Sequence, residues 1–379
     1  MSNNSTVFTT CNGTESDNYL RFSMSASMSI DILSQKSLKW QVTLEIIYVS
    51  LSTLQFLTAT IFNLLSIETL LQKKIRITSL GVYLIVFFLA SLIGMILLYF
   101  RIIVTLFFNE ELVKHSLIHC RIITTILNST LILCLWTGAF VSIERVLIQL
   151  FKYSLYRSRK NAIIISVSLI LLTTAANITT FIGWKSAVHP IVLNMRLCKF
   201  RQFPLHWKLV DEIVNSMYIH FVTPWILHVL SIACVLIDII RHKIALTDAD
   251  RCNWNTIMCQ QLKKHKDFFI PPILILTCTL PHVLLTNFSD SITQHDCSKS
   301  NMNAYLRLHI ALDFLSYLLQ TIGFFTYIYP SNVYMNRFRE TWTIRRSRAV
   351  LTALFGHHQS RTSRMIEQVQ LSVDDMNLN

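Results

Sequence analysis

Seven long apolar stretches run through the chain, and they constrain its fold more than any other feature. A helix that crosses the hydrocarbon core of a bilayer needs about 20 predominantly apolar residues. Runs of this kind lie at about 44–71, 79–107, 117–143, 161–184, 213–240, 268–288 and 308–329. The composition agrees, because 52% of the residues are hydrophobic and only 15% are charged. We therefore expect an all-α membrane protein, a seven-transmembrane helix bundle with a short cytoplasmic interfacial helix.

The apolar stretches divide the chain into four segments. Residues 1–43 are rich in Ser, Asn and Thr and show no cleavable signal peptide, so we expect an extracellular, glycosylated segment. The bundle itself is expected to span 44–330. Over 331–343 apolar and basic residues alternate at helical spacing, as in a helix that lies at the membrane interface. Residues 344–379 are polar and are expected to form a disordered cytoplasmic tail.

The distribution of Lys and Arg predicts the orientation of the bundle. Basic residues follow the first, third, fifth and seventh spans, which places these loops and the tail in the cytoplasm. The second outer loop is basic enough to blur this rule, but three glycosylation sequons, at Asn3, Asn4 and Asn12, favour an amino end outside the cell. We expect a multi-pass glycoprotein of the plasma membrane. The net charge of +13 indicates contact with anionic lipids of the bilayer rather than with nucleic acid.

Four of the nine cysteines, Cys11, Cys120, Cys198 and Cys297, fall on the expected outer side, where disulfides persist. A bridge between Cys120, at the start of the third span, and Cys198 would pin the second outer loop over the mouth of the bundle. Cys11 and Cys297 would then be left as a second pair. Four thiols permit three connectivities, and spacing does not choose among them. One or more of them can also remain free.

The third span ends in the polar cluster Glu144-Arg145-Val146, which an apolar environment does not tolerate without a reason. Two interpretations stay open from charge alone. The pair can mark the membrane boundary, since side chains near a helix end reach the interface. It can also carry function on the cytoplasmic side.

Several spacings resemble those of the rhodopsin-like G-protein-coupled receptors. In that family a cysteine that opens the third helix lies twenty-five residues before the arginine of an acidic-Arg-aromatic triplet, and Cys120 and Arg145 have this separation. The resemblance covers about 44–343. It includes further positions, namely Asn63 in the first span, Pro224 in the fifth, Pro281 in the sixth and Pro330 at the end of the seventh.

The resemblance implies a receptor that binds an extracellular ligand and activates a heterotrimeric G protein, with arrestin and a receptor kinase as further partners. Glu144 would hold Arg145 at rest, although adjacent helical residues do not share a face. Arg145 would then contact the G protein when the sixth helix moves outward. Pro224, Pro281 and Pro330 are expected to be hinges, because proline kinks a helix.

Some positions depart from the family pattern. Ser91 stands where the family usually has Asp, Cys134 where a small hydroxyl is usual, and Tyr329 where Asn precedes the last proline. We therefore expect the family's internal sodium site to be absent. Thr279 replaces a tryptophan of the sixth span, and the triplet ends in Val146. These departures indicate a divergent, orphan-like member.

The ligand class is constrained mainly by exclusion. Gly323 stands where opsins carry the retinal-binding lysine, and Leu127 where amine receptors carry an aspartate. Arg101, in the outer part of the second span, is a candidate pocket residue, although a long side chain there can also reach the interface. Asn128 and His282 would face the same pocket if the helices align as in the family. With the basic second outer loop, Arg101 favours an acidic or peptide ligand.

Other classes of function fit the chain less well. We expect no catalytic residue, cofactor or metal site, since His115 and His119 have ligand spacing but no third ligand nearby. A membrane transporter or channel is the main alternative. Such proteins tend to carry carboxylates at mid-membrane, whereas Glu68 and Asp313 are expected near span ends. A non-signalling seven-helix binding protein is the third possibility.

Overall fold

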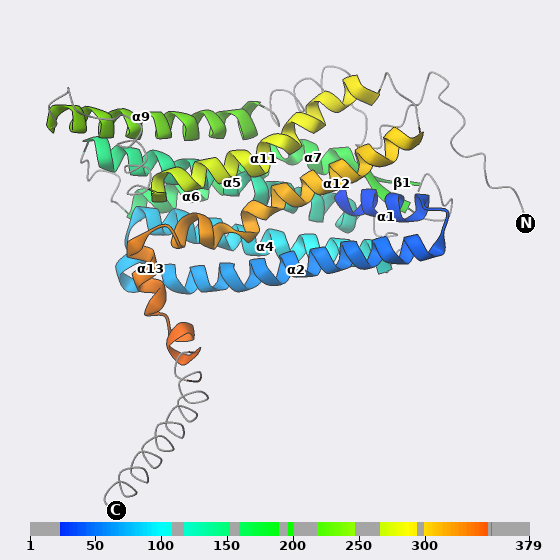
Figure 1. Cartoon of the computed structure of the whole chain (residues 1–379), viewed down its shortest axis with the longest axis horizontal. Helices are drawn as coiled ribbons and strands as arrows, with labels where there is room; N and C mark the ends of the chain where they lie inside the picture. The colour runs from blue at the N-terminus through cyan, green and yellow to red at the C-terminus, as the bar shows by residue number, and fades with distance from the viewer. Residues whose placement is uncertain are drawn as a thin grey trace, which may run out of the picture.

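A computed structural model describes residues 23–107, 117–151, 159–188, 196–200, 218–246, 266–293, 299–347 and 350 (Figure 1). The predicted sites Asn3, Asn4, Asn12, Cys11 and Cys297 lie outside these residues. The elements in chain order are α1 (Met24–Ser34), α2 (Leu38–Leu70), α3 (Lys73–Arg76), α4 (Ser79–Phe107), η3 (Leu117–Ile122), α5 (Ile123–Phe151), α6 (Arg159–Ala176), α7 (Ile178–Gly183), β1 (Trp184–Val188), β2 (Arg196–Phe200), α9 (Thr223–Leu246), α11 (Lys266–Thr293), α12 (Lys299–Thr321), η7 (Phe324–Ile328) and α13 (Asn332–Arg339).

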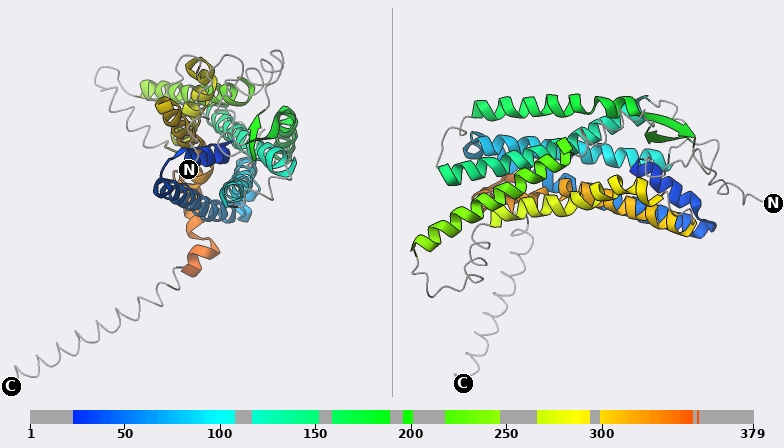
Figure 2. Two further views of the ribbon diagram at one scale, coloured as in Figure 1. Left: turned by 90° about the vertical axis from the view of Figure 1, so that its right-hand side faces the viewer. Right: turned by 90° about the horizontal axis from the view of Figure 1, so that it is seen from above.

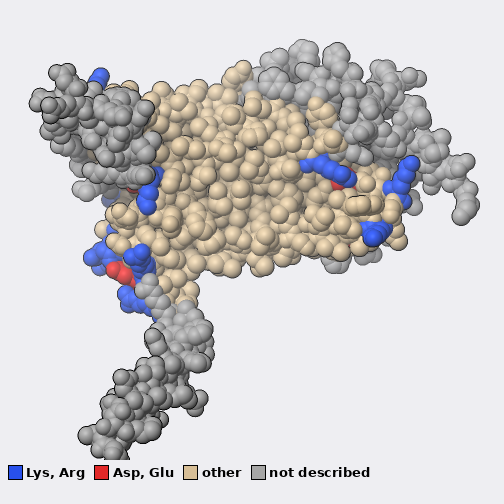
Figure 3. All heavy atoms as spheres, viewed as in Figure 1, with Lys and Arg blue, Asp and Glu red and all other residues tan. Residues whose placement is uncertain are grey.

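The chain is an all-α, multi-pass membrane protein with a single small hairpin in its described part. Six helical stretches there are long and apolar enough to cross a membrane, and they begin at Leu38, Ser79, Ile118, Arg159, Tyr218 and Lys266. The long helices run roughly along one axis, with α1 and the hairpin at one end and α13 at the other (Figure 1). We call these the α1 end and the α13 end. On the face shown in Figure 3, charged side chains gather toward both ends and leave a broad uncharged band between them.

The seventh predicted span differs from the other six. Helix α12 begins at Lys299, well before the apolar run predicted at 308–329, and the chain continues through the π-helical turn η7. Helix α12 includes Arg307, His309 and Asp313, so it is less apolar than the other six spans. These polar side chains have partners inside the molecule, which explains why an otherwise apolar helix tolerates them.

Two segment boundaries also differ from the prediction. The predicted extracellular segment 1–43 contains helix α1 and the first residues of α2. The Ser23 side chain accepts a hydrogen bond from the Ala26 amide and caps α1. At the other end, helical turns over 342–347 run from the predicted interfacial helix into the predicted tail, which was expected to begin at 344. There the Thr343 amide and hydroxyl donate to the Glu68 carboxylate at 3.1 and 2.6 Å, which fixes this segment to the end of α2.

The hairpin and the π-helical turn η3 close the α1 end. Strands β1 and β2 pair antiparallel, with Ser186 opposite Cys198. The end-on view of Figure 2 shows α1 near the centre of this end, and α1 packs against α2, α4 and α12.

Polar residues also connect the helices in the middle of the bundle. The buried Asn63 side chain donates to the Gln320 main-chain oxygen at 3.1 Å and joins α2 to α12. Ser91 of α4 and Cys134 of α5 are hydrogen-bonded to each other at 3.3 Å. Asn63 is thus an inter-helix contact, as expected for a polar residue in an apolar span.

Candidate functional site

The α13 end carries Arg145, and its guanidinium contacts the first turn of α11. Nη1 of Arg145 donates to the main-chain oxygen of Asp267, and the guanidinium lies 5.7 Å from the centre of the Phe268 ring. Arg145 is only 8% exposed. A buried guanidinium held by one carbonyl and one aromatic face is a weak link, because the strong partners of Arg are carboxylates. The Arg145 side chain therefore connects α5 to the first turn of α11 by contacts that are weaker than an ion pair.

Glu144 does not hold Arg145 in this structure. Its carboxylate accepts a hydrogen bond from Ser79 at the start of α4, and its Oε2 atom has no hydrogen-bond partner. Among the described residues, no ion pair joins Glu144 to Arg145. The reason is helical geometry, since neighbouring side chains point about 100° apart. Glu144 thus fixes α5 to α4, while Arg145 reaches across to α11.

Two further side chains complete the α13 end. Val146 packs with Val235 and Phe269 in a small apolar cluster between α5, α9 and α11. Tyr334 of α13 is buried, and burial raises the pKa of its phenol to about 12, although the Arg145 charge acts in the opposite direction. The phenol is therefore neutral at physiological pH. The site joins five helices, namely α4, α5, α9, α11 and α13.

The predicted hinge prolines lie at three different kinds of position. Pro281 is inside α11, together with Pro271 and Pro272, which we had not predicted as hinges. Pro224 is the second residue of α9 and directly follows a π-helical turn, whereas Pro330 follows η7. Three prolines in one helix remove three main-chain donors, so α11 is the long helix least supported by its own hydrogen bonds.

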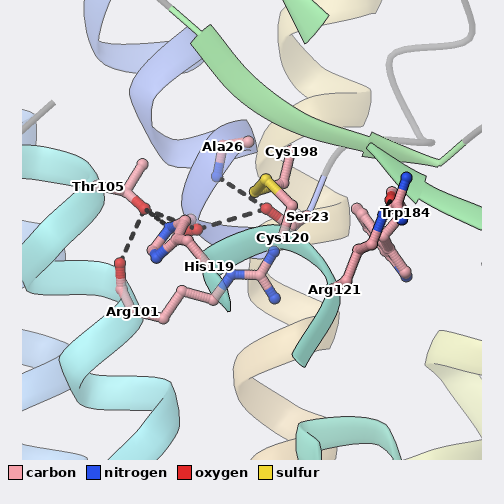
Figure 4. The surroundings of a disulfide bond; sticks show 10 residues. Ser23, Ala26, Arg101, Thr105, His119, Cys120, Arg121, Trp184 and Cys198 are labelled. Atoms are coloured by element: carbon pink, nitrogen blue, oxygen red, sulfur yellow. Dashed lines mark hydrogen bonds between the residues drawn. A yellow bond between two sulfur atoms is a disulfide. The ribbon is translucent and has the colours of Figure 1, made fainter. Parts of the chain in front are cut away.

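At the α1 end the structure places Cys120 of η3 and Cys198 of β2 in a disulfide, with Cα atoms 5.2 Å apart (Figure 4). Both cysteines are buried. The Arg121 side chain next to the bridge donates to the main-chain oxygen of Trp184 at 3.1 Å. The bridge and this hydrogen bond attach both strands of the hairpin to the start of the third span.

Arg101 lies beside this disulfide and does not reach out to the membrane interface. The side chain is 4% exposed, and its Nε and Nη2 atoms have no hydrogen-bond partner. Its guanidinium lies 5.6 Å from the centre of the Trp184 ring (Figure 4). A buried cation without a paired anion is unfavourable. Arg101 is therefore a position where a ligand anion would gain a partner.

The other predicted pocket residues lie on two different helices, with Leu127 and Asn128 on α5 and His282 on α11. Leu127 is buried in the apolar cluster that α1 covers, and Asn128 is half-buried on the same helix. His282 of α11 lies 3.3 Å from the Asp313 carboxylate, which also contacts His309 at 3.2 Å. We had expected Asp313 near a span end, but it lies inside α12. The prediction failed because the hydropathy of this segment hides the true start of the helix.

Sequence reasoning also missed an ionic contact between the buried Asp31 of α1 and the half-exposed Arg307 of α12. The Asp31 carboxylate accepts from Nε of Arg307 at 3.1 and 3.2 Å and from the hydroxyl of Tyr48 at 2.7 Å. Asp31 lies in a Ser-rich segment, and nothing in its local pattern predicts burial. The one available signal is an arginine among the apolar residues of α12.

Comparison with known proteins does not assign the chain to a family. No family model matches it, and no curated protein is significantly similar to it. Within the residues that the structure describes, no group of three or more His, Cys, Asp or Glu side chains is arranged to hold a metal ion. Fold and site together define a multi-pass helical membrane protein with a polar site at each end of the bundle.

Two arginine replacements at the α1 end should have opposite effects on stability. Arg101→Met removes a buried charge of which two nitrogens lack hydrogen-bond partners, so the free energy of unfolding should stay the same or rise by about 1–3 kcal/mol. Arg307→Met leaves the buried Asp31 carboxylate without its ionic partner and should lower it by about 1–3 kcal/mol. Thermal unfolding can be followed with a thiol-reactive dye that detects exposure of the buried Cys134 and Cys278. A fall in both variants would show that Arg101 is structural.

Proposed function

We propose that the chain is a seven-helix receptor that binds an extracellular ligand at the α1 end and activates a heterotrimeric G protein at the α13 end. The observation that carries this proposal is the weak contact of Arg145 with the Asp267 carbonyl. It links the third long helix to α11 at the surface where a cytoplasmic partner would bind. The resemblance to rhodopsin-like receptors supports the same role for Arg145.

In this proposal α12 and η7 together form the seventh span. Polar groups of α12 have partners within the bundle, since the Gln320 main-chain oxygen accepts from Asn63 and the Arg307 side chain contacts Asp31. The amino end is then extracellular and the tail cytoplasmic. Helix α13 would lie at the inner membrane interface, with Val333 and Trp342 exposed beside the basic residues Arg337 and Arg339.

The proposed mechanism is a shift between two arrangements of α11. In the proposed resting arrangement the Arg145 guanidinium would keep its contact with the base of α11. Outward movement of α11 breaks one hydrogen bond and one aromatic contact and leaves Arg145 free to contact the G protein. A ligand activates the receptor only if it binds the open arrangement more tightly.

The ligand in this proposal is acidic or peptidic. Two nitrogens of the buried Arg101 guanidinium lack hydrogen-bond partners, which favours a carboxylate or another anion as a ligand group. The Asp313 carboxylate, which contacts His282 and His309, adds an acceptor for a ligand donor. A ligand with both an acid and a donor group would use both positions.

GTP exchange in membranes that contain the protein and a panel of G proteins tests this function. We expect exchange above that of empty membranes, and we expect Arg145→Ala to reduce it to the background. Lys160→Ala, an exposed cation at the start of α6, is the matched control and should leave exchange unchanged. Equal exchange in the wild-type and Arg145→Ala proteins, at equal surface expression, would remove Arg145 from the coupling surface.

One observation favours a transporter or channel instead. A buried carboxylate with two histidines, as formed by Asp313, His282 and His309, is typical of proton or ion pathways in membranes. Under this alternative, Asp313→Asn abolishes substrate uptake or ion current, and Arg145→Ala leaves both unchanged. Under the receptor proposal no such flux exists. The two variants therefore separate the two classes.

A further inference from the structure

Helix α1 occupies the centre of the α1 end and is almost completely enclosed there. Each residue from Met24 to Ile32 is buried, and Met28 and Asp31 are 0% exposed. The helix packs against α2, α4 and α12 and shares an apolar cluster with Leu127 and Tyr317. Figure 2 shows it among the long helices rather than on their outer surface. It thus fills the space in which a ligand of a helical receptor would lie.

Polar contacts hold α1 at both of its ends. Near its carboxyl end, Asp31 is bound by Arg307 and by the Tyr48 hydroxyl. At its amino end, the Ser23 amide donates to the main-chain oxygen of Cys198 at 3.3 Å, and the Ser25 and Thr105 hydroxyls are 3.2 Å apart. These contacts come from four separate segments. The surrounding bundle therefore recognises a helix of defined length with a carboxylate in its last turns.

The fit of α1 in this enclosed space is incomplete at some of its polar groups. Four serines, at positions 23, 25, 27 and 29, are buried with it, and the Ser27 hydroxyl has no hydrogen-bond partner. An isolated helix of 11 residues is marginal in water, so α1 depends on the surrounding helices. The neighbouring Arg101 guanidinium obtains no anion from α1. The contacts around α1 thus leave one hydroxyl of the helix and two nitrogens of the neighbouring Arg101 without hydrogen-bond partners.

We propose that the α1 end is a binding site for a short helical peptide with a carboxylate, and that α1 is its tethered resident occupant. The short link Gln35–Ser37 connects α1 to α2 and keeps its local concentration high, on the order of millimolar for short tethers. An external ligand of this class must displace α1. A ligand with a second acid for Arg101 would gain a contact that α1 lacks.

This proposal does not depend on coupling to a G protein, and its test measures occupancy of the site rather than GTP exchange. The full-length chain in membranes carries Met28→Cys and is treated with a membrane-impermeant thiol reagent. Position 28 is buried, so labelling should be slow. Adding Asp31→Asn removes the negative charge that Arg307 binds and should raise the labelling rate at least 10-fold. Lys36→Cys, at the exposed link, is the positive control, and the chain without an engineered cysteine gives the background.

A synthetic peptide of residues 23–35 provides the second measurement. Fluorescence anisotropy should show saturable binding to the Asp31→Asn chain, and binding at least 10-fold weaker to the wild-type chain, whose own α1 occupies the site. A peptide with Asp31→Asn should bind at least 10-fold more weakly than the native peptide. Equal affinity of the native peptide for both chains, or a labelling rate that Asp31→Asn leaves unchanged, would overturn the proposal. Loss of GTP exchange alone would not affect it.

Discussion

Replacement of both Cys120 and Cys198 by alanine is expected to lower the Tm of the purified protein by on the order of 10 °C. The bridge closes a long loop, with a sequence separation of 78, and loss of such a disulfide typically costs about 2–5 kcal/mol of stability. The effect should spread beyond the hairpin, because the main-chain oxygen of Cys198 accepts from Ser23 at the start of α1. The double variant should therefore also loosen α1.

The measurement follows the exposure of Cys134 and Cys278 with a thiol-reactive dye during heating. Replacing both bridge cysteines together leaves no unpaired thiol at the hairpin. Cys234→Ala, which removes a cysteine outside the bridge, is the control and should shift Tm by only a small amount. Treatment of the wild-type protein with a reductant should reproduce the loss. An unchanged Tm in the double variant would mean that the hairpin is held in place without the bridge.

Gly94→Leu is expected to abolish the folded protein, and Gly94→Ala to lower its stability by about 1–3 kcal/mol. A Cβ atom at position 94 would lie 2.8 Å from Oε1 of Gln320 and 2.8 Å from Oγ1 of Thr130. Helices α4, α5 and α12 meet here, and close approach of helices requires a small residue. Gln320 cannot simply turn away, because it is 0% exposed and contacts Cys134.

A double-mutant cycle identifies the cause of this effect. Gln320→Ala should itself be destabilising, but it removes the amide that a Cβ atom would meet. The loss from Gly94→Ala should therefore be smaller in the Gln320→Ala protein than in the wild type. Ile93→Val, next to Gly94 but 48% exposed, is the control and should change Tm little. Strictly additive losses would contradict the crowding of Gln320.

The sequence was a good guide to the membrane-spanning helices. The span predicted at 79–107 coincides with α4, because an apolar run in a bilayer must form a helix to satisfy its own main-chain groups. Hydropathy was a poor guide to α12, since Arg307, His309 and Asp313 lower the apolar character of that helix. Their partners lie on other segments, so no local pattern shows that the membrane can tolerate them.

For the candidate sites, the sequence likewise predicted the important residues but not their contacts. The sequence indicated Arg101 and Arg145 as important, because a charge in or beside an apolar span is rarely tolerated without a role. It did not identify what they contact. Arg145 binds a main-chain oxygen 122 positions away. Every residue has a main-chain oxygen, so the sequence does not show which one an arginine contacts. The predicted partner Glu144 binds Ser79 instead, as the divergence of neighbouring side chains on a helix requires.

By itself, the sequence determined that the chain is a helical membrane protein and where most of its spans lie. It also determined which charged residues lie in or beside those spans. These properties depend on local composition and on the approximately 30 Å thickness of the hydrocarbon core. Only the tertiary structure decided the place of α1. Its Ser-rich sequence has no long apolar run, and its burial depends on Arg307, 276 positions from Asp31, and on Tyr48. Contacts between distant segments are set by packing of the whole bundle, and no local pattern encodes them.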